Sequence, residues 1–141
     1  MKIAKEFHWE MGHRLPYHSG LCRNFHGHSY KMVVEVEGEP SEGGMIIDFY
    51  DLGKIVKPII EKYDHAFLCW NKDTVVKNFL KKNKMKHVVA DYHSTVENIC
   101  SDFLYQIASG LKLKKFKNIY LVTVKVSETP NSYAEKSIEL S

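Results

Sequence analysis

Alternating apolar and polar positions mark two strands in the first third of the chain. Residues 3–11 place their apolar side chains on odd positions, and His13 continues that parity. Residues 30–36 place theirs on even positions, and His26 and His28 extend that inward parity. A period of two is typical of a strand with one buried face. We therefore expect two strands, each ending in histidines on its buried face.

Two longer stretches change to the period of a helix. Residues 52–63 carry apolar side chains at helical spacing, and Pro58 inside them is expected to kink or split the helix. A second helix is expected after Ser94, because Ser94 and Glu97 have the spacing of a capping box. Gly110 is expected to end it.

The remaining elements are shorter. A short helix is expected at residues 73–80. The lysine-rich segment 81–86 is predicted to be a solvated loop with no role in the chemistry. The last strands are expected at 118–128, with Tyr120 on the buried face, and at 133–140.

This order of elements predicts one α+β domain over residues 1–141. We expect a four-stranded antiparallel sheet with two main helices on one face. The other face of that sheet would be open to water or to another subunit, so a homo-oligomer is a reasonable expectation.

Composition narrows the class of protein. The 141 residues are 44% hydrophobic and 26% charged, which suits a globular domain and excludes a disordered or collagen-like chain. A net charge of +3 gives no support for a nucleic-acid partner. The sequence has no apolar run of membrane-spanning length and no signal-peptide pattern, so we expect no membrane partner and a cytoplasmic location.

The histidines carry the strongest chemical signal. His26 and His28 are two residues apart on a strand, so their imidazoles point to the same side, with Gly27 leaving room between them. His13 could supply a third nitrogen if the two strand ends are neighbours. Three nitrogens would make a catalytic zinc site, because one coordination position stays open. The alternative is that the pair of histidines is a chance or surface feature.

Cys22 lies four residues before His26 and is the candidate base or nucleophile. A nearby metal and Arg23 would both favour its thiolate. The alternative is an inert, half-buried thiol. Cys69 and Cys100 read as packing residues, and the three cysteines have no spacing typical of disulfides.

Two carboxylates stand out for different reasons. Asp64 precedes His65 and could orient its imidazole as a proton shuttle, although in isolation a polar pair at a helix end is the better explanation. Glu128 continues an apolar strand face, where a carboxylate needs donors such as the paired N–H groups of a guanine- or pterin-like ring. Alternatively, Glu128 simply caps the following turn.

Six motifs in this order and with compatible gaps resemble the 6-pyruvoyltetrahydropterin and 6-carboxytetrahydropterin synthase family. They are F-x-W-E-M-G-H-R-L, C-x-x-x-H-G-H-S-Y, G-G-M-I-I-D-F-x-x-L, Y-D-H-A-F-L, S-T-V-E-N-I and S-E-T-P-N-S-Y-A. The resemblance spans nearly the whole chain. It implies a tunnelling fold, in which the sheets of three subunits join into a barrel and two trimers stack into a homohexamer.

The resemblance also implies roles for individual residues. By this likeness the zinc ligands are His13, His26 and His28, the proton-transfer group is Cys22 with Asp64 and His65, and the residues that bind the pterin are Glu128 and Thr95. Arg14 and Arg23 flank the histidines and are candidates for a triphosphate. One departure is His93-Ser94, where relatives often carry a proline before the threonine.

A cysteine four residues before H-G-H is similar to the bacterial 6-carboxytetrahydropterin synthases of 7-deazaguanine and queuosine biosynthesis. The implied reaction converts 7,8-dihydroneopterin triphosphate to 6-carboxy-5,6,7,8-tetrahydropterin, acetaldehyde and triphosphate, with Zn²⁺ as cofactor. One alternative is an enzyme on the same scaffold that forms 6-pyruvoyltetrahydropterin. Another is a non-catalytic, zinc-dependent module that binds nucleic acid through its lysine-rich segments.

Overall fold

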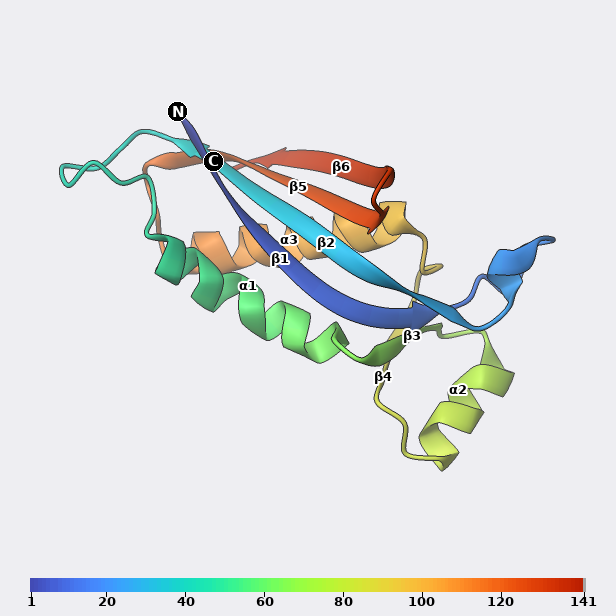
Figure 1. Ribbon diagram of the computed structural model, residues 1–141. Coiled ribbons are helices and arrows are strands. Elements are labelled where there is room, and N and C mark those ends of the chain that lie inside the picture. The colour runs from blue at the N-terminus through green and yellow to red at the C-terminus, as the bar shows by residue number, and fades with distance from the viewer. Residues whose placement is uncertain (141) are drawn as a thin grey trace.

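The computed structural model describes residues 1–140, which fold into a curved sheet with helices on one face (Figure 1). In chain order the elements are β1 (Lys2–His13), the 3-10 helix η1 (Leu21–Arg23), β2 (His26–Gly38), α1 (Phe49–Tyr63), β3 (Ala66–Trp70), α2 (Thr74–Lys82), β4 (His87–Ala90), α3 (Val96–Leu113), β5 (Ile119–Thr129) and β6 (Ser132–Glu139). None of the helices within this range combines the length and the apolar character needed to cross a membrane.

The α+β class is confirmed, but the prediction of a four-stranded antiparallel sheet was wrong. Residues 1–140 form a six-stranded sheet in the order β4-β3-β1-β2-β5-β6. The pairs formed by β1, β2, β5 and β6 are antiparallel, whereas β3 runs parallel to both β1 and β4. The two additional strands have five and four residues, and such short runs carry too little alternation to be recognised.

Helices α1 and α3 cover one face of the sheet, and α2 lies apart at the end remote from both termini (Figure 1). Aromatic rings fill the layer between the sheet and α3: Trp9 stacks on Tyr30 at 5.2 Å and on Phe103 at 5.1 Å between ring centroids. Stacked rings at these separations add to the stabilisation from burial alone. The long strands β1 and β2 are thereby fixed against α3.

The opposite face of the sheet is polar. Its side chains pair with one another: Lys2 with Glu35 at 3.2 Å, Ser29 with Glu10 at 2.7 Å, and Thr123 with Ser137 at 2.7 Å. Such a face needs no hydrophobic cover, because its side chains satisfy one another and water.

Both ends of α3 differ from their predicted positions. Thr95, rather than Ser94, is the N-cap of α3, and its hydroxyl accepts from the backbone N–H of Asn98 at 3.2 Å. The helix continues past Gly110 to Leu113 because Gly110 provides space for Ile55 of α1: a Cβ there would lie 2.6 Å from Ile55 Cγ2.

Pro58 does not split α1, which is continuous from Phe49 to Tyr63. The proline lies on the exposed side of the helix. The backbone carbonyl that loses its hydrogen-bond donor is therefore close to solvent.

Tyr120 does not lie on the buried face of β5 as expected. It is 46% exposed, and Ile119 is buried in its place. The pairing between β2 and β5 shifts between Glu37 and Gly38. That irregularity reverses the parity of the first residues of β5.

The cap of α3 gives the first testable prediction. Replacing Thr95 with alanine leaves the N–H of Asn98 without its acceptor and should lower the free energy of unfolding by about 1 kcal/mol. Thr95→Ser should retain most of the stability. Urea denaturation of the two variants and the wild type measures this, and equal stability of Thr95→Ala and wild type would contradict the assignment.

Candidate functional site

Three histidines meet where β1 ends and β2 begins. His13 lies directly opposite His26 in the antiparallel register, and His28 follows two residues later on the same face of β2. The ring centroids are 4.6 Å apart for His13–His26, 5.2 Å for His13–His28 and 5.1 Å for His26–His28. The prediction that these three side chains lie together is confirmed.

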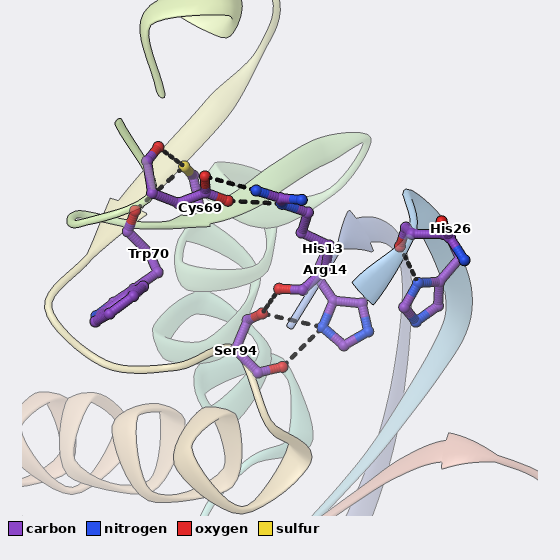
Figure 2. A network of polar contacts seen from close by, with 8 residues as sticks. His13, Arg14, His26, Cys69, Trp70 and Ser94 are labelled. Carbon is purple, nitrogen blue, oxygen red and sulfur yellow. Dashed lines mark hydrogen bonds and ion pairs between the residues drawn. The ribbon is translucent and has the colours of Figure 1, made fainter. Parts of the chain in front are cut away.

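Hydrogen bonds fix which ring nitrogen faces the cluster. His13 Nδ1 lies 2.7 Å from the backbone oxygen of Ser94, and His26 Nδ1 lies 2.8 Å from the backbone oxygen of Asn24 (Figure 2). A carbonyl oxygen only accepts, so each Nδ1 carries the proton and each Nε2 keeps its lone pair.

The cluster suits a divalent metal. One ligand atom from each histidine lies within 4.8 Å of the others. Among residues 1–140, Nε2 of His13 is buried and has no hydrogen-bond partner. A buried nitrogen with a free lone pair is unfavourable unless something binds it, and a metal ion satisfies that need.

Burial favours the neutral form of His13 and of His28. His13 is 1% exposed, and its removal from water lowers its pKa to about 4. Burial also lowers the pKa of His28, although the nearby carboxylate of Glu128 opposes the shift. Neutral imidazole is the form that binds metals, so no proton needs to leave His13 at neutral pH.

Glu128 reaches the same cluster from β5. Its Oε1 lies 3.4 Å from Nε2 of His28 and 3.5 Å from Nε2 of His13. The pairing between β5 and β6 shifts between Ser127 and Thr129, so Glu128 lies in an irregularity of the strand. Glu128 also continues the parity of Val124 and Val126, which are buried, so its carboxylate borders the candidate metal site.

Two glycines allow the strands to meet closely between the histidines. Gly12 pairs with Gly27, and a Cβ on Gly27 would lie 3.0 Å from the backbone oxygen of Met11. A cleft of about 340 Å³ adjoins this pair and is lined by both His28 and His65.

Asp64 and His65 face each other because of an unusual backbone conformation. His65 has a φ of 60°, and its Nδ1 lies 3.0 Å from Oδ1 of Asp64. The same Oδ1 accepts from the backbone N–H of Glu10 at 2.9 Å, which lowers the pKa of Asp64. A left-handed non-glycine residue is costly and is often found at functional sites.

Lys86 fixes the chain beside this pair. Its Nζ donates to the backbone oxygens of Glu61 and Asp64 at 2.8 and 2.6 Å. The segment interpreted as a loop without chemistry therefore supports the end of α1 next to His65.

The structure does not bring every predicted site residue into contact with the histidines. Cys22 lies half-buried in η1. The hydroxyl of Thr95 is used as the cap of α3. None of the hydrogen bonds or ion pairs of residues 1–140 joins Cys22, Thr95 or His65 to the cluster, so their roles remain predictions.

Arg14 and Ser94 have structural partners that the sequence did not reveal. Arg14 donates from Nε and Nη2 to the two carboxylate oxygens of Asp73 at 2.8 Å, so this edge of its guanidinium is occupied. Ser94, expected as a helix cap, is 1% exposed and contacts His13. Ser94 and His13 are 81 positions apart in the sequence, so no local pattern could have revealed this contact.

Comparison with known proteins gives a consistent result. A family model described as 6-pyruvoyl tetrahydropterin synthase matches residues 2–139. The chain is 34% identical to the 6-carboxy-5,6,7,8-tetrahydropterin synthase of Haemophilus influenzae, covering 95% of this chain and 96% of that protein. It is 32% identical to a putative 6-carboxy-5,6,7,8-tetrahydropterin synthase of Pyrococcus abyssi, with coverages of 97% and 88%.

Solved structures share the fold. The 6-pyruvoyl tetrahydropterin synthase of Plasmodium vivax superposes with a TM-score of 0.83 at 21% identity, covering 99% of this chain and 98% of that one. A protein from Wolinella succinogenes gives a TM-score of 0.79 at 25% identity, with coverages of 96% and 97%.

The low pKa of His13 predicts a pH dependence of stability in the metal-free protein. The unfolded chain has an ordinary histidine pKa near 6.5, so it takes up the proton first as the pH falls. The contribution of neutral His13 is therefore present above about pH 6.5 and is lost between pH 6.5 and 4, by about 3 kcal/mol in total.

Urea unfolding in the presence of a chelator, from pH 7 to pH 4, measures this loss. Carboxylates titrate in the same range, so the informative quantity is the difference between the wild type and His13→Gln. That difference should shrink as the pH falls, and a constant difference would contradict the burial of a neutral His13. His8→Gln is the matched control, because His8 is exposed.

The left-handed backbone at His65 predicts an order of stability between two variants. His65→Gly relieves the clash of Cβ with the backbone, whereas His65→Ala retains it. The glycine variant should be more stable than the alanine variant by about 1 kcal/mol, as measured by thermal unfolding. Greater stability of the alanine variant would show that the backbone is not left-handed there.

Proposed function

The chain belongs to the 6-pyruvoyl tetrahydropterin synthase family, and on that premise we propose that it is a zinc-dependent lyase of pterin metabolism. The proposed reaction converts 7,8-dihydroneopterin triphosphate and water to 6-carboxy-5,6,7,8-tetrahydropterin, acetaldehyde and triphosphate. The bond between the first and second carbons of the substrate side chain is broken. The observation that carries the proposal is the convergence of His13, His26 and His28 beside Glu128.

The donor set supports zinc as the metal. Imidazole nitrogens suit Zn²⁺, and three of them leave a position for substrate oxygen. A bound zinc ion would supply Lewis acidity that lowers the pKa of the substrate's side-chain hydroxyls. His13 and His26 would hold it through Nε2, since a backbone carbonyl occupies each Nδ1.

Glu128 would hold the pterin ring. Its carboxylate can accept from the two adjacent N–H groups on the ring edge, a bidentate contact that fixes orientation as well as position. Its side chain is 23% exposed and lies 3.4 Å from His28. A ring bound there would place its side chain next to the three histidines.

Cys22 and His65 would move the protons. The Cys22 thiolate would take the carbon-bound proton of the substrate side chain, and His65, oriented by Asp64, would deliver or accept the second proton. The 3.0 Å contact of His65 Nδ1 with Asp64 leaves Nε2 for this exchange. His65 and His28 line one cleft, which supports the assignment of His65.

We propose that the active form is a homohexamer, a dimer of trimers in which the sheets join into a barrel. The outermost strands, β4 and β6, each have one edge without a strand partner within residues 1–140. Such edges are suited to pairing with another copy. The corresponding cellular role would be that of a cytoplasmic enzyme in queuosine biosynthesis.

The 6-pyruvoyl product is the alternative on the same site. It is favoured by the names of the family model and of the Plasmodium structure with the same fold. The 6-carboxy product is favoured by the name of the Haemophilus relative at 34% identity. Release of acetaldehyde distinguishes the two, because the 6-pyruvoyl product retains all three side-chain carbons.

The test is incubation of purified, metal-analysed protein with 7,8-dihydroneopterin triphosphate and identification of both fragments by mass spectrometry. We expect one acetaldehyde per 6-carboxytetrahydropterin. A 6-pyruvoyl product without acetaldehyde would select the alternative, and an unchanged substrate would overturn the enzymatic function.

Cys22→Ala should lower kcat by a factor of about 10² to 10⁴, the usual contribution of a general base, while zinc content stays near that of the wild type. Cys100→Ala is the matched control, because Cys100 is buried in α3 and its thiol donates to the backbone oxygen of Val124. Undiminished turnover of Cys22→Ala would refute its assignment as the base.

A further inference from the structure

A network of partly buried polar contacts connects the candidate metal centre to the N-terminal end of α2 (Figure 2). The Ser94 hydroxyl lies 3.1 Å from His13 Nδ1 and donates to the backbone oxygen of Arg14 at 3.3 Å. Arg14 in turn donates from Nε and Nη2 to the two carboxylate oxygens of Asp73 at 2.8 Å. The contacts therefore run from Asp73 through Arg14 and Ser94 to a metal ligand.

This arrangement carries a free-energy cost. Asp73 is 7% exposed and Ser94 is 1% exposed. Burying a charged pair is costly unless its geometry is good and its remaining polar atoms are satisfied. Here the pair is bidentate.

Asp73 is also diverted from its usual local role. It is the residue before α2, yet its side chain makes no capping hydrogen bond to that helix. Aspartate at this position ordinarily accepts from the first backbone N–H groups of the helix. Both carboxylate oxygens face Arg14 instead, so the chain gives up a local stabilising contact for a distant one.

We infer that Asp73, acting through Arg14 and Ser94, is a positioning residue for His13. The bond from His13 Nδ1 to the backbone oxygen of Ser94 sets the tautomer, and that oxygen is in place only if residue 94 is held against Arg14. The ion pair holds Arg14 against α2, and Ser94 ties its own backbone to that of Arg14. A ligand held in this way needs no reorientation when a metal binds.

The inference rests on the metal centre proposed above and adds residues that are not among its proposed ligands. It assigns a purpose to the bidentate pair other than stabilising the fold. A merely structural role would predict lower stability with unchanged metal affinity. A positioning role predicts lower affinity in protein that is still fully folded.

The test is the dissociation constant for Zn²⁺, measured by chelator competition at a temperature where circular dichroism shows each variant folded. Loss of a residue that orients a metal ligand usually weakens metal binding about 10- to 100-fold. We therefore expect Asp73→Asn and Ser94→Ala each to raise Kd about tenfold. Because the two act along one chain of contacts, the double variant should also lose about tenfold rather than about a hundredfold.

Two controls separate positioning from general destabilisation. Asp48 caps α1 by accepting from the N–H of Tyr50 at 2.7 Å, so Asp48→Ala should lower stability and leave Kd unchanged. Glu6 lies on β1, the strand of His13, and its exposed carboxylate pairs with Lys31. Glu6→Gln removes this pair and should change neither the stability nor Kd.

The outcomes are distinct. Wild-type Kd in both Asp73→Asn and Ser94→Ala overturns the positioning role while leaving the metal centre standing. Equal zinc binding by wild type and His26→Ala overturns the metal centre itself. If Asp73→Asn does not fold, Arg14→Lys, which keeps the charge but loses the fork, takes its place in the same measurement.

Discussion

The antiparallel pairing of β1 with β2 at Gly12 and Gly27 is the constraint on which the site depends. It places His13 directly opposite His26 and leaves His28 on the same face. A shift of one residue in this register would turn the β2 histidines to the other face of the sheet. The stacked rings of Trp9, Tyr30 and Phe103 oppose such a shift, since they fix both strands against α3.

The sequence predicts those parts of the molecule that depend on local periodicity. The parity of β1 and β2 predicted that His26 and His28 share a face, because residues at strand positions i and i+2 do so, and that His13 could join them if the two strand ends are neighbours, as the register shows. Apolar residues at helical spacing likewise located α1 and α3. In contrast, β3 and β4 have five and four residues and are defined by their parallel neighbours rather than by their own pattern.

Contacts between distant residues were beyond sequence reasoning. Nothing in the sequence indicates that Arg14 is bound by Asp73, or that Ser94 is buried against His13. The same applies to the left-handed φ of His65, without which adjacent side chains would not pair. Glu128 was noticed because a carboxylate on an apolar parity is unusual, and that parity agrees with its position: β2 pairs with β5 as far as Lys31 and Ser127, and the next residue of β5 lies beside the histidines.

The spacing of these groups along the chain also affects the order in which the site forms during folding. His13 and His26 belong to one hairpin, so little chain entropy is lost in bringing them together, and this part can form early in folding. The carbonyl that orients His13 lies 81 residues further on and arrives only when α3 packs on the sheet. In a partly folded chain, and in a nascent chain during synthesis, His26 would therefore already be oriented by Asn24, whereas the orientation of His13 would be set last.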